Sequence, residues 1–216
     1  MKTNRTELAF ILDRSGSMCG LEADTIGGYN AMLEKQKKEA GEAIVTTVLF
    51  DDQYELLHDR IDLRGIAPIT DREYYVRGST ALLDAIGKTI QKIANIQKRT
   101  APEFRADRVL FVITTDGHEN ASREYSYSKV KALLERQKKQ YDWEFLFLGA
   151  NIDAIATAQR FGIEADRAVD YHADGEGTQL NYQVLSETVS CVRAGAPIKE
   201  NWKQRIEENF RSRKRK

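Results

Sequence analysis

Long hydrophobic runs are absent from this sequence, and no stretch approaches the roughly 20 apolar residues that a membrane-spanning helix needs. The first residues, Met1–Glu7, contain no apolar core of the kind found in secretory signal peptides. They lead directly into a short apolar run, Leu8–Leu12. We therefore expect a cytoplasmic protein that makes no contact with a membrane.

Cysteine is also scarce, with two residues in a chain of 216. Cys19 and Cys191 fall in segments that a sheet flanked by helices would place at opposite ends of its strands. A disulfide bond between them is geometrically unfavourable, so we expect two reduced thiols.

Net charge is lacking as well, because 33 Lys and Arg residues balance 33 Asp and Glu residues. The balance is uneven along the chain, since residues 199–216 hold eight Lys or Arg and three Glu. A mildly acidic body therefore carries a basic tail.

What the sequence does contain is a regular alternation of strand-like and helix-like segments. We predict strands at 7–12, 42–50, 53–58, 108–114, 143–148 and 168–171, and helices at 21–40, 80–97, 126–140, 150–161 and 179–192. This alternation is typical of a doubly wound α/β domain. The second and third strands are separated by two residues, which predicts a hairpin and an antiparallel edge strand. The fold prediction is thus a mostly parallel sheet of about six strands, one of them antiparallel, with helices on both faces.

The predicted domain covers residues 1–198, and the basic tail covers 199–216. The segment 59–78 has no clear periodicity, and a loop of that length in a compact domain is usually functional. Gly27-Gly28 lies inside a predicted helix, where glycine is costly, and this predicts close packing of the helix against the sheet. In the tail, Trp202, Ile206 and Phe210 recur at helical spacing and predict a helix docked on the domain.

Side chains with oxygen atoms follow the ends of two predicted strands and precede one predicted helix. Asp13, Ser15 and Ser17 come directly after the first strand, Thr80 opens the helix at 80–97, and Asp116 follows the most apolar strand. In open α/β sheets, ligand sites form beyond the carboxyl ends of the strands, where these groups would meet. A ligand set made only of oxygen suits Mg²⁺ or Mn²⁺ better than zinc. We assign Ser79, the residue before Thr80, to capping of the helix.

The combined pattern Asp13-x-Ser15-x-Ser17, Gly78-Ser79-Thr80 and Thr115-Asp116-Gly117 resembles the metal-ion-dependent adhesion site of von Willebrand factor type A domains. The resemblance covers roughly residues 6–195. Within this family, the sequence is similar to the compact bacterial intracellular members rather than to the secreted adhesive ones. It implies that Asp13, Ser15 and Ser17 hold Mg²⁺, that Thr80 is a direct or switchable ligand, and that Asp116 binds directly or through water. Thr115 stands where Leu is more usual and His118 follows Gly117, but neither departure removes a ligand oxygen.

A site of this composition leaves a coordination position open for an incoming carboxylate. We therefore expect a metal-dependent adaptor or assembly factor that recognises a Glu or Asp of a partner protein. No general base is evident, so we expect no catalysis. Two alternatives remain open: a Mg²⁺-dependent phosphatase or phosphotransferase that uses Asp13 as nucleophile, and a nucleic-acid-binding component that acts through the tail. The phosphatase chemistry typically needs a second acid at position 15, where this chain has Ser15.

Aromatic, cationic and polar side chains near the three segments are candidate partner contacts. They are Arg14, Tyr74, Tyr75, Arg77, His118 and Glu119. Aromatic residues and Arg are the types enriched at binding hot spots. Arg14, which lies between two predicted ligands, would guide an acidic partner by its charge.

Overall fold

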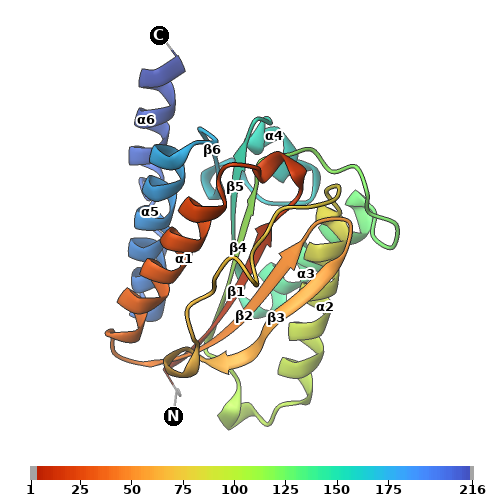
Figure 1. The fold of residues 1–216 in the computed structure, drawn as a ribbon. Coiled ribbons are helices and arrows are strands. Elements are labelled where there is room, and N and C mark those ends of the chain that lie inside the picture. The colour runs from red at the N-terminus through yellow and green to blue at the C-terminus, as the bar shows by residue number, and fades with distance from the viewer. Residues whose placement is uncertain (1–3, 215–216) are drawn as a thin grey trace.

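The computed structural model describes residues 4–214, and within that range a central sheet separates two layers of helices (Figure 1). The strands are β1 (Arg5–Asp13), β2 (Glu42–Phe50), β3 (Tyr54–Asp62), β4 (Arg108–Thr115), β5 (Glu144–Ala150) and β6 (Ala168–Tyr171). Their order across the sheet is β3-β2-β1-β4-β5-β6. All neighbouring pairs are parallel except β2 and β3, which form the predicted hairpin. The predicted fold class is confirmed.

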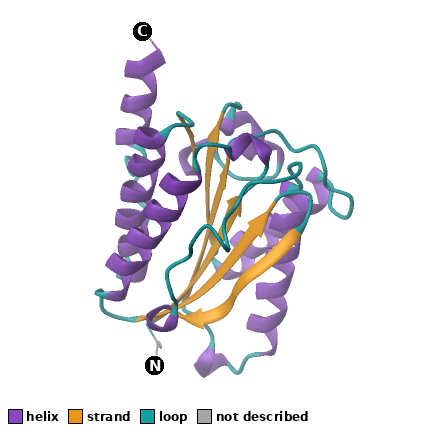
Figure 2. Cartoon of the chain, in the orientation of Figure 1, coloured by secondary structure: helices purple, strands orange, loops and turns teal. Residues whose placement is uncertain are grey.

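The helices cover both faces of this sheet, as Figure 2 shows. They are α1 (Glu22–Lys37), α2 (Leu82–Arg99), α3 (Tyr127–Tyr141), α4 (Ala154–Arg160), α5 (Gly175–Arg193) and α6 (Gln204–Lys214). One hydrophobic core joins the sheet to α1, α5 and α6, and a second joins it to α2, α3 and α4.

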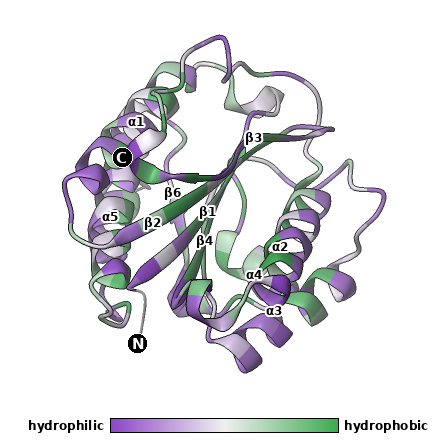
Figure 3. Ribbon diagram, turned by 90° about the horizontal axis from the view of Figure 1, so that it is seen from below, coloured by the Kyte–Doolittle hydropathy of each residue, from purple (hydrophilic) through white to green (hydrophobic). Residues whose placement is uncertain are grey.

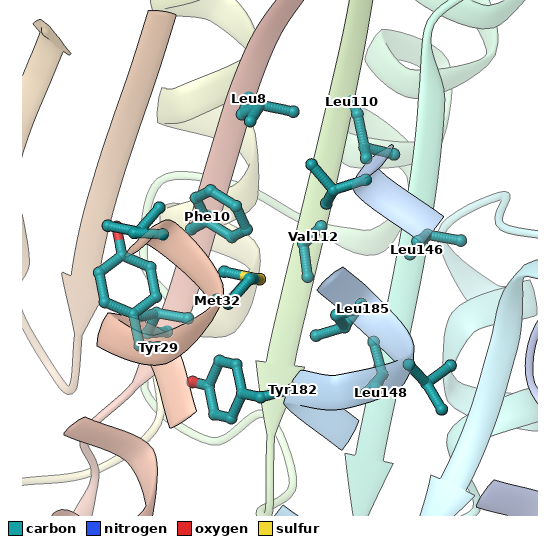
Figure 4. Close-up of a cluster of buried hydrophobic side chains, with 14 of the residues drawn as sticks. Leu8, Phe10, Tyr29, Met32, Leu110, Val112, Leu146, Leu148, Tyr182 and Leu185 are labelled. Atoms are coloured by element: carbon teal, nitrogen blue, oxygen red, sulfur yellow. The ribbon is translucent and has the colours of Figure 1, made fainter. Parts of the chain in front are cut away.

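The central strands are buried on both faces, which explains their nearly continuous apolar sequences. Along β1, Leu8 and Phe10 enter the first core, while Ala9 and Ile11 enter the second, because successive strand residues point to opposite faces. Figure 4 shows Phe10 beside Met32 of α1, with Leu8 further along the strand. Figure 3, a view from below, shows hydrophobic stretches of the central strands between the two groups of helices.

Two local expectations were wrong. Strand β3 continues to Asp62, so the irregular segment is shorter than predicted and begins after a turn of 3₁₀ helix at Leu63–Gly65. The Gly27-Gly28 pair does not pack against the sheet. A β-carbon at Gly28 would lie 2.2 Å from Cδ2 of Tyr182, so this glycine permits close packing of α1 on α5.

The tail helix α6 packs on the domain, as its apolar spacing predicted. Ile206 is buried in the first core, and the indole of Trp202 donates a hydrogen bond to the carbonyl of Asp166 (2.7 Å). Lys203 Nζ donates to the carbonyls of Ala165 (2.6 Å) and Ala168 (2.7 Å). Met1–Thr3 and the last two basic residues of the predicted tail, Arg215 and Lys216, lie outside the described residues.

Cys19 and Cys191 are free thiols, as predicted. Among the helices of residues 4–214, none is both long enough and apolar enough to cross a membrane.

Candidate metal centre

The three predicted ligand segments meet at the carboxyl ends of β1 and β4. These strands are parallel neighbours, with Leu12 paired to Thr114, so Asp13 and Thr115 end side by side. The loop after β1 contacts the segment before α2 through a hydrogen bond from Gly16 N to the carbonyl of Gly78 (3.2 Å). That edge of the sheet therefore holds all three segments in one place.

The same segment is tied to the loop after β4. Asn120 N donates to the carbonyl of Thr80 (3.0 Å), and Thr80 N donates to Asn120 Oδ1 (2.9 Å). This reciprocal pair fixes the backbone of Thr80 against the loop that carries Asp116.

The side-chain oxygens of the predicted ligands form one cluster. Ser17 Oγ donates a hydrogen bond to Asp116 Oδ1 (2.5 Å) and lies 3.1 Å from Ser15 Oγ. A β-carbon built on Gly117 would lie 3.0 Å from Ser17 Oγ and 3.4 Å from Thr80 Oγ1, which places both hydroxyls around this glycine. The absence of a side chain at Gly117 keeps the space between these oxygens open.

Both carboxylates in this cluster are buried. Burial raises the pKa of Asp13 to about 6, although hydrogen bonds from Thr115 and Ser15 oppose the rise. Burial also raises the pKa of Asp116, against a hydrogen bond from Ser17. Within residues 4–214, Asp116 Oδ2 is a buried oxygen with no hydrogen-bond partner. A buried carboxylate oxygen without a partner is costly, and a cation is the group that would satisfy it.

The chemistry of these donors fits a hard divalent cation, because two carboxylates and three hydroxyls supply only oxygen. The described part of the chain contains no group of three or more His, Cys, Asp or Glu side chains placed to hold a metal. A cation at this edge would therefore depend on the hydroxyls of Ser15, Ser17 and Thr80.

Thr115 and Tyr74, which the sequence analysis did not count among the metal ligands, support Asp13 together with the backbone of Ser15. Thr115 Oγ1 donates to Asp13 Oδ2 (2.5 Å), and Ser15 N donates to Asp13 Oδ1 (2.7 Å). Tyr74, which is fully buried, donates its hydroxyl to the carbonyl of Asp13 (2.5 Å). The unusual Thr at position 115 was a usable signal in the sequence. Tyr74 gave none, and its predicted contact with a partner is wrong because its ring does not reach the surface.

The prediction that Arg14 guides a partner is also wrong. Its side chain is 0% exposed, with Nε 3.0 Å from Asp51 Oδ2 and Nη2 2.6 Å from Glu55 Oε2. Arg77 also binds Asp51, through Nε at 2.6 Å, although part of its side chain remains exposed. Tyr75 is 42% exposed, and its ring centroid lies 5.2 Å from Arg14 Cζ and 5.4 Å from Arg77 Cζ. Tyr75 is thus available to a partner on a firmly held aromatic face.

Glu119 has a structural role instead of the predicted partner contact. Its Oε2 accepts a hydrogen bond from Leu83 N (2.9 Å) at the start of α2, and its Oε1 accepts one from Ser122 N (2.8 Å). Ser122 Oγ in turn accepts from Asp84 N (3.0 Å). These groups cap α2, so the assignment of Ser79 to capping is corrected. His118 is exposed and remains free to meet a partner.

No family model and no curated protein matches the chain, and its likeness to known proteins lies in solved structures. A variant of the PilB minor pilin from Streptococcus sanguinis superposes with a TM-score of 0.60 and 14% identity, over 89% of this chain and 64% of that one. The vWF domain of the type V pili tip protein Mfa5 from Porphyromonas gingivalis superposes with a TM-score of 0.59 and 10% identity, over 89% of this chain and 97% of that domain.

A third structure, proximal thread matrix protein 1 from the mussel byssus, is described as having a zinc-occupied MIDAS motif. It gives a TM-score of 0.58 and 12% identity, over 86% of this chain and 46% of that one. The chain thus spans less than two thirds of the pilin and of the byssus protein. At these identities the similarity concerns the fold.

Proposed function

Because the chain has the fold of a von Willebrand factor type A domain, we propose that it binds a partner protein through a divalent metal ion at the carboxyl edge of its sheet. Asp13, Ser15, Ser17, Thr80 and Asp116 would hold the ion, with Mg²⁺ or Mn²⁺ as the expected metal. The ion would offer an electrophilic position to a Glu or Asp carboxylate of the partner.

The observation that carries this proposal is the buried, unpartnered Oδ2 of Asp116 beside a cluster of hydroxyls. Without a cation, two buried carboxyl groups share one small space, and both have raised pKa values. A divalent cation would compensate both charges at once. Its preference for hydroxyl and carboxylate oxygens matches the groups present.

A pocket beside the cluster supports partner recognition. It has a volume of about 660 Å³ and is lined in part by Ser79 and Asn120, which flank Thr80 in space. The exposed ring of Tyr75 and the exposed His118 lie on the loops of the same edge. Side chains next to the partner's Glu or Asp could then contact both the pocket and the exposed aromatic rings.

An enzymatic function receives less support from the surroundings of Asp13. Both of its carboxylate oxygens accept hydrogen bonds, from Ser15 N and Thr115 Oγ1, and position 15 lacks the second acid that phosphoaspartyl chemistry typically needs. We therefore propose binding without catalysis.

Nucleic-acid binding through the tail is also the weaker alternative. Arg213 pairs with Asp174, and Arg211 lies 3.1 Å from Glu207, so part of the positive charge of α6 is already balanced within the chain. Phosphate binding depends on several unbalanced cations.

The test is a comparison of partner capture by the immobilised chain in Mg²⁺ and in EDTA, combined with calorimetric titration of Mg²⁺ and Mn²⁺. Asp13→Asn should abolish both metal binding and metal-dependent capture. Asp153→Asn is the matched control, because Asp153 lies at the same edge and its carboxylate caps α4 by accepting from Ala156 N (2.8 Å). Capture that is unchanged by EDTA and by Asp13→Asn would contradict the proposal.

A further inference from the structure

Asp51, in the turn after β2, binds both loops that carry candidate ligands without itself belonging to the oxygen cluster. Its side chain is fully buried, and its Oδ2 accepts from Arg14 Nε (3.0 Å) and from Arg77 Nε (2.6 Å). Its Oδ1 accepts from Gln53 N (2.7 Å). One carboxylate therefore joins an arginine of the loop after β1 to an arginine of the segment before α2.

Backbone hydrogen bonds join the same segments as these ion pairs. Arg77 N donates to the carbonyl of Arg14 (2.9 Å), and Arg14 N donates to the carbonyl of Phe50 (2.8 Å). The carbonyl of Asp51 accepts from Ala81 N (2.7 Å), the residue that follows Thr80. Asp51 is thus attached on one side to the neighbour of Asp13 and on the other to the neighbour of Thr80.

The charges of this group are balanced, which favours the ionised form of its carboxylates. Arg14 is also paired with Glu55, which leaves two arginines facing two carboxylates. Burial raises the pKa of Asp51, but the hydrogen bond from Arg77 and the charges of both arginines outweigh it, and the pKa stays below its usual value. Buried charges held this way have few alternative arrangements.

We infer that the Arg14–Asp51–Arg77 triad sets the spacing between the Asp13–Ser17 loop and Thr80, which makes Asp51 a positioning residue for the metal. This inference rests on the proposed function and names what holds its site in shape. Mg²⁺ and similar ions demand near-ideal ligand geometry, so a small displacement of one loop against the other weakens binding. Arg14 and Arg77 would thus hold the two loops in position through Asp51 and would not bind the partner.

Arg77→Ala tests this inference, and we expect the variant to fold because the Arg77 side chain is partly exposed. Mn²⁺ is titrated calorimetrically into the full chain, and we expect an affinity about tenfold or more below that of the wild type. Arg77→Lys keeps the charge but not the planar guanidinium, so its Mn²⁺ affinity should lie between those of the wild type and Arg77→Ala. Arg72→Ala, an exposed arginine in the same segment, is the control and should leave the affinity unchanged.

Asp51→Asn should weaken Mn²⁺ binding at least as much as Arg77→Ala. If both residues act through their shared contact, the double variant should bind no more weakly than Asp51→Asn alone. Far-ultraviolet circular dichroism and thermal melts report whether each variant is folded at the temperature of the titration.

Wild-type Mn²⁺ affinity in a folded Arg77→Ala chain would overturn the inference, and so would variants that lower only the melting temperature. These outcomes leave the proposed metal function standing. A wild-type chain that binds neither Mn²⁺ nor Mg²⁺ would overturn the proposed function, and the inference with it.

Discussion

Replacing Asp13 by asparagine should stabilise the metal-free chain while abolishing metal binding. Burial moves the pKa of Asp13 from 3.8 to about 6, which means that the fold prefers the neutral form. Holding the ionised form at pH 7 therefore costs about 3 kcal/mol, from a shift of about two units at 1.36 kcal/mol each. Asparagine has nearly the same shape and no charge. Its carbonyl can still accept from Ser15 N, and its amide can donate to Thr115 Oγ1.

The sign of the pH dependence follows from the same shift. Because the pKa of Asp13 is raised, the contribution of this group to the free energy of unfolding is greatest below pH 4 and is lost as the pH rises through about 6. The advantage of Asp13→Asn over the wild type should therefore be about 3 kcal/mol at pH 7 and should vanish near pH 4. The difference between the two chains isolates this group, because the other carboxyl groups are common to both.

Urea unfolding in EDTA, at several values between pH 4 and pH 7, measures this difference. Adding Mg²⁺ should stabilise the wild type and leave Asp13→Asn unchanged, since a ligand stabilises only the form that binds it. Asp153→Asn serves as the control for a carboxylate at the same sheet edge. A metal-free Asp13→Asn chain that is less stable than the wild type at pH 7 would refute the reasoning from burial.

The sheet and the position of the site could be predicted because both depend on local patterns. Apolar runs that end in oxygen-bearing residues identify strands and their carboxyl ends, and the register of β1 and β4 then brings Asp13 beside Thr115. The structure cannot be predicted from such patterns where a distant residue decides the environment. Arg14 has no local signal for burial, because its partners Asp51 and Glu55 are supplied by the β2–β3 hairpin.

The start of α2 illustrates the same limit. A serine directly before an apolar helical pattern usually caps the helix, which made Ser79 the natural choice. The capping carboxylate is instead that of Glu119, and it reaches Leu83 N from a loop 36 residues further along the chain. A contact between distant residues thus caps the helix in place of a neighbouring serine. The periodicity of the sequence cannot predict such a contact.

Three further predictions concern the surroundings of the site and the tail. Thr115→Val removes the hydroxyl that donates to Asp13, a bond to a charged group that contributes about 1.5 kcal/mol, so the midpoint of pH-dependent Mn²⁺ binding should rise by about one unit. Identical midpoints between pH 5 and pH 8 would show that this hydroxyl does not tune Asp13. Gly78→Ala should lower the free energy of unfolding by more than the 1 to 2 kcal/mol or so of left-handed strain, because φ is +66° and a β-carbon would overlap Asp52. Gly20→Ala, at φ +89° with open space around the added β-carbon, should lower the free energy of unfolding by the backbone strain alone. Equal decreases for the two variants in urea titrations would count against the overlap with Asp52. Ile206→Ala should destabilise the domain by about 2 kcal/mol or more if α6 is docked as described, and an unchanged urea midpoint would mean that it is not.

The most direct measurement is the anomalous scattering of crystals soaked in MnCl₂. The account predicts one strong manganese peak among the oxygens of Asp13, Ser15, Ser17, Thr80 and Asp116, with at least one coordination position held by water or by an acid from another molecule. No peak at this edge of the sheet, or an ion whose coordination is completed entirely by side chains of its own chain, would contradict it.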